Sequence, residues 1–313
     1  IWRIVFLINE GPRVMVKKVI IKGNISFSEK RLKKKMLTRK GGFSDEILAD
    51  DLDAILAFYH SSGYLKAEFT SLDVSLDKKK KNAIVTITIE EGPRTLVKEV
   101  VFEGLSAFPG EDALKVLKLV PGAPFDPSLL DEDKKKLILK YADSGYPYAK
   151  VSQNIIEGEK KEEVTILYSI SEGKEVRVGE LLIQGNYRTR PRVLNREVTL
   201  VKDEPFSYSA LLESRKNLRT LAILDTVRLD TLGLEEELDV AHLLLKVGER
   251  KSRSLDIGGG YDSENGLELS LEVGDLNFLG YGKALGLKLL GGEYLNRAEL
   301  SLIDPRFMGK RIR

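Results

Sequence analysis

The phrase EGPR stands at residues 10–13 and again at 91–94 of this 313-residue chain. Each copy leads into a similar run, VKKVIIKGN at 16–24 and VKEVVFEGL at 97–105. Self-similarity at a fixed period is the sequence signature of tandem structural units. The repeat therefore predicts that the chain is built of tandem structural units.

Other landmarks keep the same period. Gly23, Gly104 and Gly185 end similar apolar runs and follow one another at intervals of about 81 residues. Two further phrases match, SSGYLKAEF at 61–69 and DSGYPYAKV at 143–151. The third copy lacks the Gly-Tyr pair at this place and reads TLAILDTVRL instead.

Each copy predicts the order β-α-α-β-β. The run VKKVIIKG alternates and is rich in β-branched residues, which is typical of a strand. A short basic helix is expected around 29–38. A second helix should follow side chains that can accept an orphan backbone N–H, namely Ser44, Asp126 and Ser207. Two more strands complete the unit, and in the first copy they are expected near 65–76 and 83–90.

The ends of the second helix carry further signals. Phe precedes each N-cap and Leu follows four residues later, at Leu48, Leu130 and Leu211, which predicts a hydrophobic staple in every copy. Gly63 and Gly145 are expected to end the first two helices in the left-handed conformation. The helices should cover one face of a three-stranded sheet and leave its edge strands able to pair with another chain.

These landmarks divide the chain into five segments. We expect the last strand of a truncated preceding unit at 1–13, complete units at 14–93, 94–175 and 176–250, and a different structure at 251–313. The three complete units are called modules 1, 2 and 3. Since no signal peptide is visible and the chain opens inside a strand-like run, we interpret it as a piece of a longer protein.

The last sixty residues follow a period of two. Apolar residues alternate with polar ones in three rows: Leu267, Leu269, Leu271 and Val273; Leu285, Leu287 and Leu289; Leu300 and Leu302. Glycine is dense and aromatic residues lie near the turns. Strands of about 9–11 residues with one apolar side are typical of a transmembrane β-barrel. A soluble β-meander would show the same periodicity.

The repeated KGN, GY and EGP phrases, followed by GGGYDSENGLELSLEVGDLNFLGYGKAL and DPRF, resemble the Omp85 superfamily of outer-membrane proteins. The resemblance covers essentially the whole chain. It implies an α+β fold of tandem β-α-α-β-β POTRA domains followed by the first antiparallel strands of a transmembrane β-barrel. About four strands are too few to close a cylinder.

The resemblance also implies a function and a location. It predicts an assembly factor, not an enzyme, whose POTRA repeats lie in the periplasm of a Gram-negative bacterium and whose full-length barrel lies in the outer membrane. The expected partners are unfolded outer-membrane proteins, bound by strand addition, and accessory outer-membrane lipoproteins. Related transporters, of the two-partner secretion or the translocation-and-assembly kind, are the alternative, and a cell-division scaffold is a more distant one.

In POTRA domains the first strand of the C-terminal hairpin is associated with strand addition, which points here to residues 65–76, 148–157 and 227–231. The candidate edge residues are Leu65, Lys66, Ala67, Glu68 and Phe69; Tyr148, Ala149, Lys150, Val151 and Ser152; and Val227, Arg228 and Leu229. The first barrel strand is a further candidate, with Leu255, Ile257, Gly258, Gly259, Gly260 and Tyr261.

Composition argues against other classes of function. The chain has no cysteine, which excludes a disulfide, a thiolate metal site and a Cys nucleophile. Its formal net charge of +2 predicts no nucleic-acid partner. The only histidines, His60 and His242, fall in different units, and no phosphate-binding or catalytic motif is present. We therefore expect no catalytic residue, metal or cofactor, and interpret the lysine runs as solvated surfaces.

Overall fold

The computed structural model describes residues 14–38, 42–77, 81–158, 160, 162–263, 266–293 and 296–306. The strand expected at 1–13 lies outside these residues. The chain forms two compact units, Ile1–Leu137 with Val151–Ile170 and Ile138–Lys150 with Ser171–Arg313. Each unit is described by itself.

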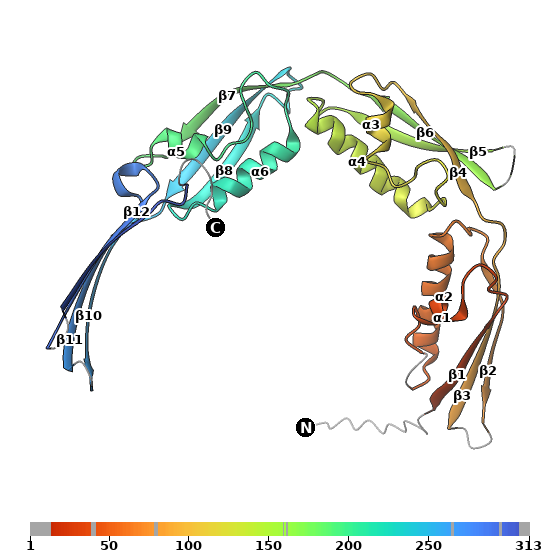
Figure 1. The fold of residues 1–313 in the computed structure, drawn as a ribbon. Coiled ribbons are helices and arrows are strands. Elements are labelled where there is room, and N and C mark those ends of the chain that lie inside the picture. Colours follow the sequence, from red (N-terminus) through yellow and green to blue (C-terminus); the bar gives the residue numbers. More distant parts are fainter. Residues whose placement is uncertain are drawn as a thin grey trace, which may run out of the picture. The chain divides into compact units, whose positions relative to one another are not determined.

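Module 1 lies within the first unit. Its elements are β1 (Met15–Lys22), α1 (Glu29–Lys33), α2 (Asp45–His60), β2 (Glu68–Leu76) and β3 (Asn82–Glu90). The sheet order is β1-β3-β2, with β3 parallel to β1 and antiparallel to β2. Both helices lie on one face of this sheet (Figure 1). The central strand is therefore covered, whereas β2 forms an edge.

Module 2 repeats this order across the boundary between the units. Its elements are β4 (Leu96–Glu103), α3 (Gly110–Leu114), the 3-10 turn η1 (Pro127–Leu129), α4 (Leu130–Asp143), β5 (Lys150–Glu157) and β6 (Glu163–Ser171). The sheet order is β4-β6-β5, so β5 takes the place of β2.

The second unit contains module 3 and a separate antiparallel sheet, here called the C-terminal sheet. Module 3 consists of β7 (Arg177–Gln184), α5 (Pro191–Asn195), α6 (Tyr208–Arg219), β8 (Leu224–Leu232) and β9 (Val240–Glu249), in the order β7-β9-β8. The C-terminal sheet consists of β10 (Arg253–Asp262), β11 (Gly266–Asp275), β12 (Ala284–Gly292) and β13 (Asn296–Ile303), with the 3-10 turn η2 (Phe278–Gly280) between β11 and β12.

The predicted helix signals are confirmed. The side chains of Ser44, Asp126 and Ser207 accept the N–H groups of Ile47, Ser128 and Ala210. Gly63 and Gly145 have φ values of +92° and +94°, which place them in the left-handed region that glycine tolerates best. In modules 1 and 3 the apolar faces of the helices pack on the central strand, where Ile87 and Leu245 are fully buried.

A buried polar residue lies seven positions after each N-cap. Asp51 accepts the N–H groups of Leu37 and Thr38 at 2.6 and 2.7 Å. Asp133 accepts those of Lys118 and Leu119 at 2.8–2.9 Å. Ser214 accepts that of Thr199 at 2.8 Å. These bonds tie the end of the first helical segment to the second helix, and they explain why α1 ends at Lys33 instead of continuing to Thr38.

Candidate strand-binding edges

Each three-stranded sheet has two edges, and one is partly covered by its own chain. The loop before the second helix forms a bridge to the first strand in all three modules, through the pairs Met15–Gly42, Leu96–Pro124 and Arg177–Pro205. The other edge, formed by β2, β5 or β8, has no strand partner among the described residues. It is therefore the freer edge for an added strand.

The outward-facing groups of β2 follow from its register. Asp77 N donates to Asn82 O at 2.9 Å, and Leu76 faces Ala83 in the next pair. Because hydrogen-bonded and non-hydrogen-bonded pairs alternate along antiparallel strands, the backbone groups of Leu76, Val74 and Leu72 point away from β3. No side chain in the described part of the chain bonds to these groups. They form an open hydrogen-bonding edge.

Apolar side chains flank this open edge. Leu72 and Leu76 pair with the buried Ile87 and Ala83, so they lie on the helix-covered face of the sheet. They are nevertheless 46% and 48% exposed. Leu52 of α2 is half-buried and packs on the module core. A strand added to β2 would find alternate apolar contacts as well as backbone partners.

The β5 edge is partly capped by its own side chains. The Asn154 Oδ1 atom accepts the N–H of Ile155 at 2.9 Å, which occupies a backbone donor in the middle of the strand. Gln153 Nε2 donates to Asp131 Oδ1 of α4 at 3.0 Å. Ile155 and Ile156 are both exposed. The edge thus has apolar surface but fewer free backbone groups than β2.

The β8 edge carries charged side chains. Arg215 of α6 donates from Nε and Nη2 to the carbonyl oxygen of Leu229, at 3.0 and 2.8 Å. Arg228 and Asp230 form an ion pair of 2.8 Å along the strand. The adjacent depression has a volume of about 330 Å³ and is lined largely by charged residues.

The structure corrects part of the expected edges. Leu65, Lys66 and Ala67 precede β2 because Ala67 N donates to Tyr64 O in a turn, and the Ala67 side chain enters the core. Tyr148 and Ala149 precede β5 for the equivalent reason, since Ala149 N donates to Tyr146 O. The remaining expected residues lie within the strands: Glu68 and Phe69; Lys150, Val151 and Ser152; Val227, Arg228 and Leu229.

Tyr148 instead belongs to a joint within the second unit. Its hydroxyl donates to Leu238 O at 2.9 Å, in the loop between β8 and β9. Asp143 accepts from Ser207 and Ser209 at 2.7–3.0 Å, and Val176 N donates to Gly145 O at 2.7 Å. The end of module 2 is thereby hydrogen-bonded to module 3.

Module 3 is also joined to the C-terminal sheet. The Thr189 hydroxyl accepts from Asn277 Nδ2 at 2.9 Å, and Glu249 accepts the Thr189 N–H at 2.6 Å. Burial raises the pKa of Glu249, but hydrogen bonds from Thr189 and Arg188 outweigh burial and hold this pKa below its ordinary value. Gly280, at φ +77°, lies so close to Arg188 that a Cβ would stand 2.2 Å from the Arg188 carbonyl oxygen.

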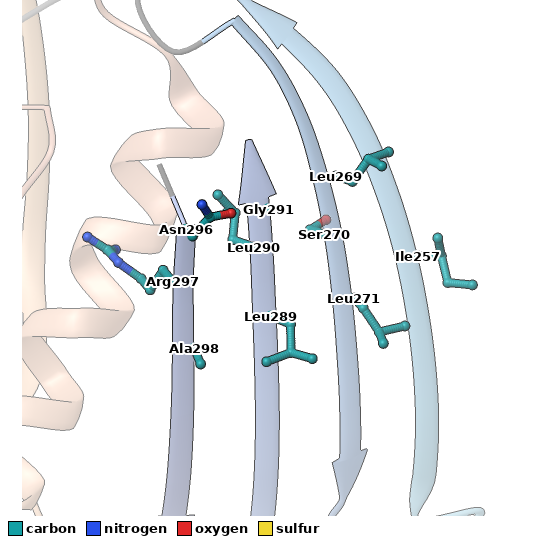
Figure 2. Close-up of a pocket in the computed structure, with 10 residues that line it drawn as sticks. All are labelled: Ile257, Leu269, Ser270, Leu271, Leu289, Leu290, Gly291, Asn296, Arg297 and Ala298. Carbon is teal, nitrogen blue, oxygen red and sulfur yellow. The ribbon is translucent and has the colours of Figure 1, made fainter. Parts of the chain in front are cut away.

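The C-terminal sheet has one apolar and one polar face. Rows of cross-strand partners include Ile257–Leu271–Leu289–Ala298 on one face and Asp256–Glu272–Lys288–Glu299 on the other. Figure 2 shows Ile257, Leu269, Leu271 and Leu289 projecting from the strands. They line a shallow depression of about 590 Å³. The apolar side chains on this face, including Leu255, Tyr261 and Leu300, are exposed.

The first strand of this sheet is fully paired on one side. β10 and β11 match over ten consecutive partners, from Arg253–Asp275 to Asp262–Gly266, without a register shift. The candidate residues Gly258, Gly259 and Gly260 lie within this paired stretch. Gly258 permits close packing, because a Cβ there would lie 2.7 Å from Ser270 Oγ. The outer side of β10 has no partner among the described residues.

Neither metal-binding nor helical membrane-spanning features are found in the residues that the structure describes. No group of three or more His, Asp or Glu side chains is placed to hold a metal ion. No helix there is both long and apolar enough to cross a membrane. His242 serves a structural role, since its Nδ1 atom accepts the N–H of Glu180 at 3.0 Å.

The repeated topology agrees with comparisons to known proteins. The POTRA family model, described as surface antigen variable number repeat, matches residues 14–92 and 95–173, slightly more than half of the chain. The chain belongs to the POTRA family. Module 3 lies outside the matched residues but has the same strand order as the two matched modules, and its second helix has a side-chain N-cap at the equivalent position, Ser207.

Relatives align along nearly the whole chain. It is 26% identical over 311 residues to the outer membrane protein assembly factor BamA of Neisseria meningitidis serogroup B, covering 96% of this chain and 39% of that protein. It is 27% identical over 317 residues to BamA of Nitratidesulfovibrio vulgaris, covering 97% and 40%. The chain thus spans about two fifths of the length of these curated relatives, and the resemblance to the Omp85 superfamily is confirmed.

A solved structure supports the fold. The crystal structure of BamA from Haemophilus ducreyi lacking POTRA domains 1–3 matches with a TM-score of 0.54 and 23% identity, over 69% of this chain and 40% of that chain. The α+β class expected from the sequence is confirmed by this likeness and by the repeated sheet topology.

Sequence reasoning missed the residues that distinguish one edge from another. In the sequence, Arg215 looks like an ordinary charged residue on a helix surface, because the carbonyl group that it contacts belongs to a different element. Asn154 reads as a solvated strand residue. The available signal for Arg215 was its position, because the equivalent residue of module 1, eight positions after the N-cap, is the apolar Leu52.

Proposed function

We propose that this chain is part of an outer-membrane protein assembly factor of the BamA kind. Its POTRA modules, divided at 93/94, 175/176 and 250/251, would lie in the periplasm and bind unfolded outer-membrane proteins. Accessory outer-membrane lipoproteins would be further partners. The relatives that align along 96–97% of the chain carry this description and support the proposal. The activity would be binding and templating, with no catalytic step.

The observation that carries the proposal is the open edge of β2. Three consecutive outward-facing residues, Leu72, Val74 and Leu76, have unpartnered backbone groups among the described residues and apolar side chains on one face. Strand addition draws affinity from main-chain hydrogen bonds, so it tolerates different client sequences, while side-chain contacts favour alternating apolar residues. Barrel strands have that alternation.

The C-terminal sheet supports the proposed location. Leu267, Leu269 and Leu302 are each more than 60% exposed and share one face. Soluble proteins rarely expose contiguous apolar patches of such extent. A lipid-facing surface accounts for the alternation, and β10–β13 would then be the first strands of an outer-membrane barrel.

Photocrosslinking tests the proposal. A photoreactive amino acid is placed at Ser75 on β2, or at Asp53 on the exposed face of α2 as a control, in the protein that carries this chain. A radiolabelled, urea-unfolded outer-membrane β-barrel protein is then diluted into the sample. We expect client adducts at Ser75 and few at Asp53. Equal labelling at both positions, or labelling at Asp53 alone, would contradict edge binding.

A further inference from the structure

Modules 1 and 3 have equivalent edge positions that differ in side-chain exposure and in backbone hydrogen bonding. A Cβ on Gly23 would lie 2.0 Å from the carbonyl oxygen of Ile89, and a Cβ on Gly185 would lie 2.0 Å from that of Val247. Ile89 and Val247 are therefore equivalent positions. Two residues earlier on these central strands are Ile87 and Leu245, whose edge partners are Leu72 and Leu229.

The exposure of these two edge residues differs. Leu72 is 46% exposed, whereas Leu229 is 2% exposed. Leu229 is buried in the module 3 core, and the long side chain of Arg215 reaches its backbone. The equivalent helix position in module 1 is Leu52, which has no polar group and leaves the β2 backbone open.

The backbone at Leu229 is also occupied. A carbonyl oxygen has two lone pairs, and two N–H groups of Arg215 bond to this one. By its equivalence to Leu72, the Leu229 carbonyl points away from β9 and toward the free edge. A client strand would have to displace a charge-assisted hydrogen bond before it could pair at this point.

Charge beside the strand adds to this barrier. Arg228 and Asp230 form an ion pair on β8, and Glu235 and Glu236 of the following loop line the same depression as Arg215. Charged side chains at an edge are a common way for natural sheets to prevent pairing with other chains. At the positions that correspond to Arg228 and Asp230, β2 carries Ser71 and Asp73, so β2 has no such ion pair.

We propose that Arg215 closes the β8 edge of module 3 to strand addition, whereas the β2 edge of module 1 stays open. The residue eight positions after the N-cap of the second helix, Leu52 in module 1 and Arg215 in module 3, is then the specificity-determining position of these two modules. Leucine at this position leaves the edge open, and arginine that reaches the edge carbonyl closes it. This inference rests on the proposed function, because it states which modules take the client.

Reciprocal substitutions test the proposal. Arg215→Leu gives module 3 the residue of module 1, and Leu52→Arg does the reverse. The photoreactive amino acid is placed at Thr226 on β8 or Ser75 on β2, with the same unfolded barrel client. We expect Arg215→Leu to raise adducts at Thr226 about tenfold and Leu52→Arg to lower those at Ser75 by a similar factor. Arg215→Lys, which keeps the charge but loses the guanidinium fork, should fall between.

The outcomes separate this inference from the proposed function. Wild-type labelling at Ser75 with no gain at Thr226 in Arg215→Leu overturns the closing role and leaves the assembly function intact. Strong wild-type labelling at Thr226 overturns it as well. Absence of labelling at Ser75 in the wild type counts against the proposed function itself. Arg215→Gln is a second variant that keeps a polar side chain, and unchanged circular dichroism verifies that each variant is folded.

Discussion

The modules and the C-terminal sheet use the same alternation of apolar and polar residues with opposite results. In module 1 the apolar face of β3 is covered by α1 and α2, and Val85 and Ile87 are fully buried. In the C-terminal sheet the apolar face is bare, and Leu300 is 72% exposed. Each module supplies two helices between its first and second strands, whereas the strands of the C-terminal sheet are joined by short connections. The length of the connection therefore determines whether the apolar face of a sheet is covered by helices of the same chain or stays exposed.

The pairing of the strands differs as well. Each parallel pair in a module has a register shift, between Val16 and Lys18, Val97 and Glu99, or Val178 and Leu181. The three pairs of the C-terminal sheet run without a shift. A register shift bends a strand and changes the direction of its side chains, which lets them pack around a small core. A ladder without a shift is compatible with a large, regular sheet surface.

The largest expected effect is a loss of stability in module 2. Asp133→Ala removes the acceptor of the Lys118 and Leu119 N–H groups inside module 2. Buried backbone donors left without a partner cost about 1–3 kcal/mol each, so the free energy of unfolding should fall by roughly 3 kcal/mol. A urea titration followed by circular dichroism measures this. Glu111→Ala, on the exposed face of α3, is the control, and an equal midpoint for both variants would refute the role of Asp133.

A substitution on the apolar face of the C-terminal sheet should leave the free energy of unfolding in water unchanged and weaken membrane association. Leu287→Arg places a charge on the bare apolar face, at an expected cost of about 2–4 kcal/mol near the bilayer midplane. Flotation with phospholipid vesicles measures the loss of membrane association. The matched control is Glu272→Arg on the polar face, and an equal loss for both variants would contradict a lipid-facing apolar side.

The equivalent substitution in module 3 should cause a smaller loss of stability than in module 2. Ser214 occupies the place of Asp133 but offers a neutral acceptor to one N–H group, that of Thr199. We therefore expect Ser214→Ala to lower the free energy of unfolding by only about 1 kcal/mol. Native-state hydrogen exchange of the Thr199 amide should show the loss locally. A destabilisation as large as that of Asp133→Ala would contradict the weaker role of Ser214.

The smallest expected effect is a change of local stability with pH. The pKa of Glu249 is lowered in the folded state, so its contribution to stability is present above the ordinary value of 4.5 and is lost as the pH falls through the lower, folded value. Acidification should loosen the loop that holds Arg188 and Thr189. Hydrogen exchange of the Thr189 amide between neutral and acidic pH measures this. Glu249→Gln should remove the pH dependence, and an unchanged dependence in that variant would contradict the assignment.

Local chemistry explains which features could be predicted from the sequence. The N-caps at Ser44 and Ser207 and the left-handed Gly63 depend on neighbouring residues, and all were predicted. The first turn after the helix was misread, because Ala67 is apolar like a strand residue but enters the core from a turn. The strands β2, β5 and β8 lie at sheet edges, as the resemblance to POTRA domains implied.

Long-range contacts explain what could not be predicted. Asp51 and Asp133 lie on the apolar faces of their helices, yet their backbone partners are in loops 13–15 residues earlier. Arg215 reaches a carbonyl on a strand 14 residues later. The sequence gives the residue type in each case but not the distance to its partner, so the difference between an open and a closed edge became visible only in the structure.

Hydrogen exchange of the edge amides measures directly whether a client strand adds to β2. The amide N–H groups of Leu72, Val74 and Leu76 face away from β3, so they should exchange freely in the protein alone. Adding an unfolded outer-membrane barrel protein should slow their exchange at least about tenfold, because they then bond to the client strand. The Leu229 amide and the α2 amides should not change. Protection confined to α2, or no protection on β2, would contradict strand addition.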